Sequence, residues 1–112
     1  VDAADRQSDR PDFAMAIYPG HIALDDGRLN PNLTVSSETP PTFLVQAEDD
    51  STDGVRQSLV YYAALAKAGV PAELHLYAHG GHAFGLRRTK WPITHWTDLA
   101  DAWMRTIGVL PH

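Results

Sequence analysis

Two short segments of the sequence carry the side chains best suited to acid–base chemistry. The first is an acidic turn with carboxylates at Asp49, Asp50 and Asp53, and the second is a glycine-containing loop around His82. An aspartate that accepts the imidazole N–H of a histidine fixes its tautomer, and the other ring nitrogen can then act as a general base. The residue types therefore indicate an acid–base pair, provided that the fold brings the two segments together.

Other functional interpretations of the titratable residues are poorer. His75 and His79 are expected to be structural or solvated. A metal site at His79 and His82 is disfavoured because they lack helical i, i+4 spacing and a convincing carboxylate partner. The 112 residues contain no cysteine, which excludes thiolate nucleophiles, disulfides and sulfur-bound zinc. We therefore predict neither a metal nor a cofactor.

Length and composition indicate one globular domain over residues 1–112, since 44% of the residues are hydrophobic. The nine basic and fourteen acidic residues give a net charge of −5, which provides little attraction for nucleic acid or anionic lipid. No apolar run approaches the ~18 residues of a membrane span. The sequence opens at Val1 without a methionine, so we expect a portion of a longer sequence, and the cellular compartment is left undetermined.

The hydrophobic pattern predicts three strands and two helices. The strands are expected at about 13–18, 42–47 and 72–77, and the helices at about 55–68 and 94–107. This order predicts an α/β fold in three layers, with a mainly parallel sheet of about three strands and flanking helices. Functional groups in such sheets collect in the loops that leave the carboxyl ends of strands. The acidic turn follows the second strand and the histidine loop follows the third.

The periodicity also predicts which helix faces are buried. In the first helix one apolar face comprises Val55, Leu59, Tyr62, Ala63 and Ala66. In the second helix the corresponding stripe comprises Trp96, Leu99, Trp103 and Ile107, which is expected to pack against the sheet. The segment 20–41 is rich in turn residues and is expected to be a loop with one short helical turn.

An ordered set of motifs covers nearly the whole chain. The set comprises the run from Arg10 to Ala14 with Tyr18-Pro19-Gly20, the run from Pro40 to Gln46, Glu48-Asp49-Asp50, the run from Leu59 to Leu65 with Gly69-Val70-Pro71, the run from Glu73 to Tyr77, and the run from Gly80 to Leu86. In this order and at these separations the sequence resembles the C-terminal portion of α/β-hydrolase esterases of the acetylxylan-esterase-like and dienelactone-hydrolase-like groups. The resemblance implies the C-terminal half of an α/β-hydrolase fold and a carboxylic-ester hydrolase activity.

The same resemblance implies roles for individual residues. The family places its catalytic acid at Asp50 and its catalytic base at His82. The acid is followed by Ser51-Thr52 rather than by the family's usual Pro-Val, so Asp49 and Asp53 stay open as alternatives. Ala83 stands where the family usually has a glycine after the histidine.

The nucleophile of a serine hydrolase is missing from this sequence. Such a serine lies in a G-x-S-x-G turn, and none of the five serines has glycines at that spacing; they are Ser8, Ser36, Ser37, Ser51 and Ser58. In the family the nucleophile precedes the first strand seen here. The identity of any nucleophile is therefore unknown. Ser36 or Ser37 of a partner chain is a remote candidate. We expect weak or no esterase activity.

The alternative is a non-catalytic half-domain. It would bind small molecules at most, through aromatic residues such as Tyr18, Phe84 and Trp91. In the family the strand at 13–18 has a further neighbour that this sequence lacks. That edge would be bare and apolar, and we expect two copies to pair through it as a homodimer.

Overall fold

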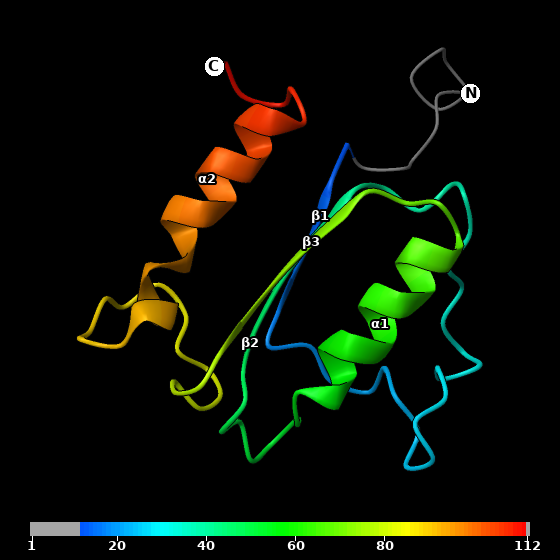
Figure 1. The fold of residues 1–112 in the computed structure, drawn as a ribbon, viewed down its shortest axis with the longest axis horizontal. Helices are drawn as coiled ribbons and strands as arrows, with labels where there is room; N and C mark the ends of the chain where they lie inside the picture. The colour runs from blue at the N-terminus through cyan, green and yellow to red at the C-terminus, as the bar shows by residue number, and fades with distance from the viewer. Residues whose placement is uncertain (1–11, 112) are drawn as a thin grey trace, which may run out of the picture.

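The computed structural model describes residues 12–111 and contains three strands and two α-helices (Figure 1). In chain order the elements are β1 (Ala14–Ile17), β2 (Thr42–Ala47), α1 (Arg56–Lys67), β3 (Ala72–Tyr77), a 3₁₀ turn (Pro92–His95) and α2 (Trp96–Thr106). The second helix begins later than predicted, because Pro92 lies in a tighter 3₁₀ turn that precedes it. The segment 20–41 contains an isolated antiparallel bridge between Ala23 and Leu29, where we had expected a helical turn.

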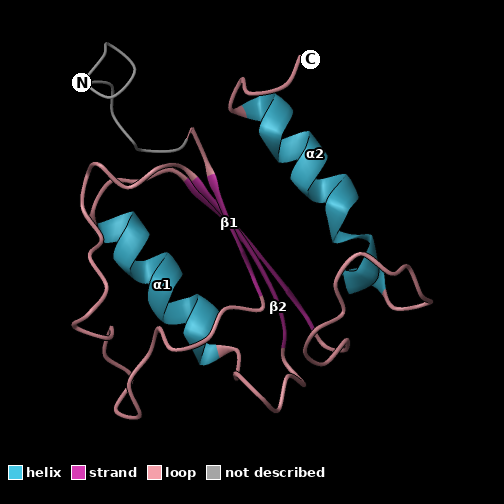
Figure 2. Cartoon of the chain, turned by 180° about the vertical axis from the view of Figure 1, so that it is seen from behind, coloured by secondary structure: helices cyan, strands magenta, loops and turns pink. Residues whose placement is uncertain are grey.

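The strands form one parallel sheet in the order β1-β2-β3. Ala14 pairs with Thr42, and Thr42 pairs with Ala72, so the three strands begin at the same level. Strands β2 and β3 also end together, whereas β1 ends opposite Val45. Helix α1 covers one face of the sheet and α2 covers the other (Figures 1 and 2). The prediction of a three-layer α/β fold with a parallel sheet is confirmed.

The central strand β2 forms the middle of the core. All six of its residues are buried, because β1 and β3 flank it and a helix covers each face. Side chains alternate between the faces of a strand, so Phe43 and Val45 pack towards α2 while Leu44 packs towards α1. The edge strands are only partly buried.

Helix α1 packs on a different face from the one that the apolar periodicity predicts. Ser58 and Leu65 are its buried residues, whereas Leu59 is 48% exposed and Tyr62 is 37% exposed. The buried residues lie about 100° around the helix axis from the predicted face. The prediction was wrong because Ser58 makes a buried hydrogen bond to β2, through Gln46, which orients this side of the helix towards the sheet.

The observed orientation of α1 has a measurable consequence for stability. We expect Leu65→Ala to lower the free energy of unfolding by about 3 kcal/mol, since it opens a cavity beside β2. Leu59→Ala removes the same atoms from an exposed position, and its effect should be below about 0.5 kcal/mol. Urea unfolding of both variants measures the difference. A larger loss in Leu59→Ala than in Leu65→Ala would mean that the helix packs on the face that the periodicity predicts, and equal losses would contradict the observed orientation.

Helix α2 packs as predicted. Trp96, Ala100 and Trp103 are buried, and Leu99 and Ile107 are partly buried against the same cluster. The indole Nε1–H of Trp96 donates a hydrogen bond of 2.7 Å to the carbonyl oxygen of Gly85. This bond ties the loop that follows β3 to the start of the helix. No helix in residues 12–111 has the length and hydropathy needed to cross a membrane.

Candidate active site

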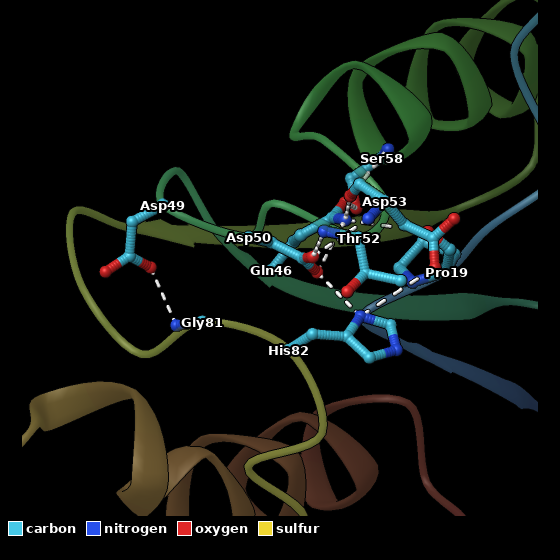
Figure 3. A network of polar contacts seen from close by, with 9 residues as sticks. All are labelled: Pro19, Gln46, Asp49, Asp50, Thr52, Asp53, Ser58, Gly81 and His82. Atoms are coloured by element: carbon cyan, nitrogen blue, oxygen red, sulfur yellow. Dashed lines mark hydrogen bonds and ion pairs between the residues drawn. The ribbon is translucent and has the colours of Figure 1, made fainter.

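The acidic turn and the histidine loop meet at the carboxyl ends of β2 and β3. Asp50 lies three residues after β2, and His82 lies five residues after β3. Because the two strands are parallel neighbours, the loops leave the same edge of the sheet. The Nδ1 atom of His82 lies 2.8 Å from Oδ2 of Asp50 (Figure 3).

The carboxylate of Asp50 is held by several donors. Its residue is only 4% exposed, and Oδ1 accepts the backbone N–H groups of Thr52 and Asp53, each at 2.9 Å. Desolvation raises the pKa of Asp50, but hydrogen bonds from Asp53, His82, Thr52 and Gln46 outweigh it, so this pKa lies below its ordinary value. The carboxylate is therefore ionised at neutral pH and accepts the imidazole N–H.

The other two carboxylates of the turn occupy different positions. Asp53 Oδ2 lies 3.8 Å from His82 Nδ1, beyond hydrogen-bonding distance. Asp49 lies on the opposite side of the turn and accepts the backbone N–H group of Gly81 at 2.7 Å (Figure 3). It also accepts the backbone N–H group of Gly80 at 3.3 Å. Asp49 thus stabilises the backbone of the histidine loop. Of the three carboxylates, only Asp50 forms a hydrogen bond with the imidazole.

Gln46 is a site residue that the sequence analysis missed. This fully buried side chain accepts hydrogen bonds at Oε1 from both the backbone N–H and the hydroxyl of Ser58. Its amide nitrogen donates to the carbonyl oxygen of Asp53 and lies 3.5 Å from both Asp50 Oδ2 and the Pro19 carbonyl. Gln46 therefore connects the strand, the acidic turn and the start of α1. The available signal was a lone amide in an otherwise apolar strand.

An aromatic side chain from the end of β1 completes the surroundings of the imidazole. The ring of Tyr18 lies 4.6 Å from that of His82 and 4.8 Å from that of Phe84, measured between centroids. Tyr18 has a φ of 39° and Ala83 a φ of 60°, a conformation uncommon for residues other than glycine. All three strand ends thus contribute to the site.

The remaining histidines named in the sequence analysis lie apart from this pair. His75 Nε2 lies 2.8 Å from Glu73 Oε2, on β3. His79 packs against Trp91 with 4.9 Å between ring centroids. Within residues 12–111, no group of three or more His, Asp or Glu side chains is arranged to hold a metal ion.

None of the serines that the structure describes forms a hydrogen bond with His82 in this chain. Ser36 and Ser37 line a separate pocket near the end of α1, and Ser58 is engaged with Gln46. Ser51 is exposed on the acidic turn. Ser8 lies outside the described residues.

Comparisons with known proteins show which family this chain resembles in sequence and in fold. Residues 27–107 match the model of the prolyl oligopeptidase family. An acetyl ester-xyloside bifunctional hydrolase from Caldicellulosiruptor lactoaceticus is 36% identical to this chain, with a TM-score of 0.83 over 97% of the chain and 47% of the hydrolase. The carboxylesterase Cest-2923 from Lactobacillus plantarum WCFS1 shares the fold at 20% identity, with a TM-score of 0.76 over 96% of this chain and 49% of the enzyme.

These matches cover only part of the length of the related proteins. The chain spans about half the length of the solved structures that it resembles. No curated protein matches it. The three-stranded parallel sheet and its two helices correspond to part of an α/β-hydrolase fold. Because the family model covers most of the sequence, the chain belongs to the prolyl oligopeptidase family of α/β-hydrolases.

Proposed function

We propose that this chain supplies the acid and the base of a serine-type carboxylic-ester hydrolase. Asp50 is the orienting acid and His82 is the general base. The observation that carries the proposal is the 2.8 Å contact between a buried Asp50 carboxylate and Nδ1 of a partly exposed imidazole. Such a contact is what the acid–base half of a Ser-His-Asp triad requires, and it supports the proposal.

The proposed chemistry follows from the two ring nitrogens. Asp50 accepts the Nδ1–H bond, which leaves the lone pair of Nε2 directed away from the acid. Nε2 removes the proton of the serine hydroxyl as its oxygen attacks the ester carbonyl, and it then returns that proton to the departing alcohol oxygen. The imidazolium formed between these steps is stabilised by the Asp50 carboxylate. Water repeats the sequence to release the acid.

The serine of this mechanism comes from outside the 112 residues, since no G-x-S-x-G motif occurs in them. The chain by itself would retain general-base assistance to water, which contributes about 10²–10⁴-fold. We propose a small ester as substrate, because the Caldicellulosiruptor lactoaceticus protein is described as an acetyl ester hydrolase.

A chimera tests the proposal directly. Residues 12–111 would replace the matching half of the Caldicellulosiruptor lactoaceticus hydrolase, whose other half would supply the nucleophile. We expect a fluorophosphonate to form one adduct, detected by intact mass, and His82→Ala to slow its formation by about 10³-fold or more. His75→Ala, on β3, is the matched control and should leave labelling unchanged.

Two results would contradict the proposal. Labelling that persists at the same rate in His82→Ala would remove His82 from the role of base. An adduct on the unfused 112-residue chain would place the nucleophile in this sequence, and peptide mapping would identify the serine.

The free edge of β1 favours a second possibility for the chain on its own, a non-catalytic homodimer. Within residues 12–111, β1 pairs only with β2. The N–H groups of Ala14 and Tyr18 donate towards β2, so the alternating pattern directs those of Met15 and Ile17 to the open edge. We propose that a second copy pairs there across a two-fold axis, joining two sheets into one.

A proline substitution separates this pairing from side-chain packing. Met15→Pro removes a backbone donor at the open edge and leaves the donors towards β2 in place. We expect light scattering to give twice the chain mass of 12.3 kDa for the unmodified protein and one chain mass for Met15→Pro. Met15→Ala keeps the N–H group and should remain dimeric. A monomeric unmodified chain at micromolar concentration would refute the pairing.

A further inference from the structure

A cavity of about 490 Å³ opens beside the imidazole of His82. Residues 80–94, which connect β3 to α2, line it entirely. The lining side chains that bear on its chemistry are His82, Phe84, Leu86, Arg87, Lys90 and Trp91. Any group placed in this cavity would therefore lie next to the proposed general base.

The charge of the cavity is opposite to that of the chain. The protein carries a net charge of −5, yet the cavity lining includes Arg87 and Lys90 and no Asp or Glu. The intervening Arg88 is compensated, since its guanidinium bonds to Asp98 at 2.7 Å and to His95 at 2.8 Å. In the part of the chain that the structure describes, no carboxylate forms an ion pair with Arg87 or Lys90.

Two carboxylates that contact the cavity-lining segment already have partners there. Asp50 bonds to His82, and Asp49 accepts the backbone N–H groups of Gly80 and Gly81. Neither is left over to neutralise the two cations. An anion supplied from outside would find, at one opening, two positive charges that no carboxylate of residues 12–111 pairs with.

Apolar surface accompanies these charges. Trp91 is 39% exposed and Leu86 is 75% exposed, and both line the cavity. Lys90 Nζ lies 5.0 Å from the centroid of the Trp91 ring, so the cation and the aromatic surface are presented together. A ligand that matches this surface has a negative group joined to an apolar portion.

We propose that this cavity binds the carboxylate end of a substrate that is a half-ester of a dicarboxylic acid. The inference rests on the proposed function, because it assigns the substrate class of the same site. Arg87 and Lys90 attract the free carboxylate, and Phe84, Leu86 and Trp91 contact the connecting methylene groups. The ester group is thereby directed towards His82. Arg87 and Lys90 are specificity-determining residues in this assignment, and take no part in the proton transfers.

Binding to the full 112-residue chain tests the assignment without requiring hydrolysis. The probes are monomethyl glutarate, which carries one carboxylate, and dimethyl glutarate, which carries none. The indole N–H resonance of Trp91 reports occupancy in ¹⁵N-resolved NMR titrations. We expect the monoester to bind at least five-fold more tightly than the diester in low salt. That preference should shrink as salt is added.

Charge-removing variants then locate the binding groups. Arg87→Gln and Lys90→Gln should each raise the dissociation constant of the monoester by about five-fold. This is the effect expected from losing one nearby charge of opposite sign in a solvated site. Binding of the diester should be unchanged in both. Lys67→Gln is the matched control, because Lys67 lies on α1 and does not line this cavity.

The outcomes distinguish this inference from the proposed function. Equal affinity for the two probes, an unmoved Trp91 resonance, or an equal loss in Lys67→Gln would overturn the anionic subsite. None of these results bears on the His82-dependent labelling of the chimera. Conversely, selective monoester binding with no His82-dependent labelling would retain the subsite and refute the hydrolase mechanism.

Discussion

Asp50→Asn is expected to lower kcat of the chimeric hydrolase by about 10⁴-fold while leaving KM nearly unchanged. The amide has almost the shape of the carboxylate, so the turn should keep its geometry. It cannot stabilise the imidazolium with a negative charge, and its NH₂ group opposes the required tautomer of His82. Steady-state hydrolysis of p-nitrophenyl acetate by the chimera and by its Asp50→Asn variant measures the effect.

The neighbouring carboxylates provide matched controls for this result. Asp53 Oδ2 lies 3.8 Å from the imidazole nitrogen, and Asp49 is bonded to the backbone of the histidine loop. We expect Asp53→Asn and Asp49→Asn each to lower kcat by less than about 10-fold, because neither removes the direct bond to His82. A loss in Asp53→Asn as large as that in Asp50→Asn would show that the acid is not Asp50 alone.

Gln46→Leu is expected to lower the free energy of unfolding by about 3 kcal/mol, among the largest effects of a polar substitution in this chain. Leucine has a similar volume but bonds to nothing. The change leaves the buried Ser58 hydroxyl without its acceptor and the Asp53 carbonyl without its amide donor. Each unsatisfied buried group costs roughly 1–3 kcal/mol. Urea unfolding monitored by tryptophan fluorescence measures the loss.

Ser58→Ala separates the two halves of that network. It removes the hydroxyl but leaves the Gln46 amide bonded to Asp53 and its Oε1 atom bonded to the Ser58 N–H. Its cost should therefore be about 1 kcal/mol. If Gln46→Leu were no more destabilising than Ser58→Ala, Gln46 would not be the residue that holds the acidic turn against α1.

The two substitutions act on one assembly at the carboxyl end of the sheet. Gln46 is the penultimate residue of β2, and its amide reaches the turn that carries Asp50. Asp50, on that turn, positions His82 through the bond to its imidazole. A loss of order in the strand network is thus transmitted to the acid–base pair. We expect Gln46→Leu also to reduce the activity of the chimera, and Ser58→Ala to affect it little.

Some features of the site follow from local sequence pattern. The apolar run at 42–47 lies where β2 is found, because a strand covered on both faces needs a continuous apolar run. The alternating apolar and polar residues at 72–77 lie where the partly buried edge strand β3 is found. Alternation of strands with a helix implies parallel pairing, and parallel strands place the turns that follow them at one edge. The pairing of Asp50 with His82 was expected from the family resemblance rather than from spacing.

Other features could not be obtained from that pattern. The apolar periodicity favours Leu59 and Tyr62 for the buried face of α1, but these side chains are exposed. Periodicity counts side-chain polarity along one helix and contains no information on which polar group a neighbouring strand presents. Here the strand presents Gln46, and its bonds to Ser58 orient the helix.

By itself, then, the sequence determined the α/β class, the positions of the strands and the segments that carry acid–base chemistry. These depend on residues that are near one another in the chain, where turn chemistry and hydrophobic period act directly. Only the tertiary structure decided that Asp50 rather than Asp53 bonds to His82 and that Tyr18 covers the imidazole. It also decided that two cations line the adjoining cavity without an ion-pair partner among residues 12–111. Each of these is a contact or a missing ion pair between segments distant in sequence, and its distance is set by the packing of the sheet and helices.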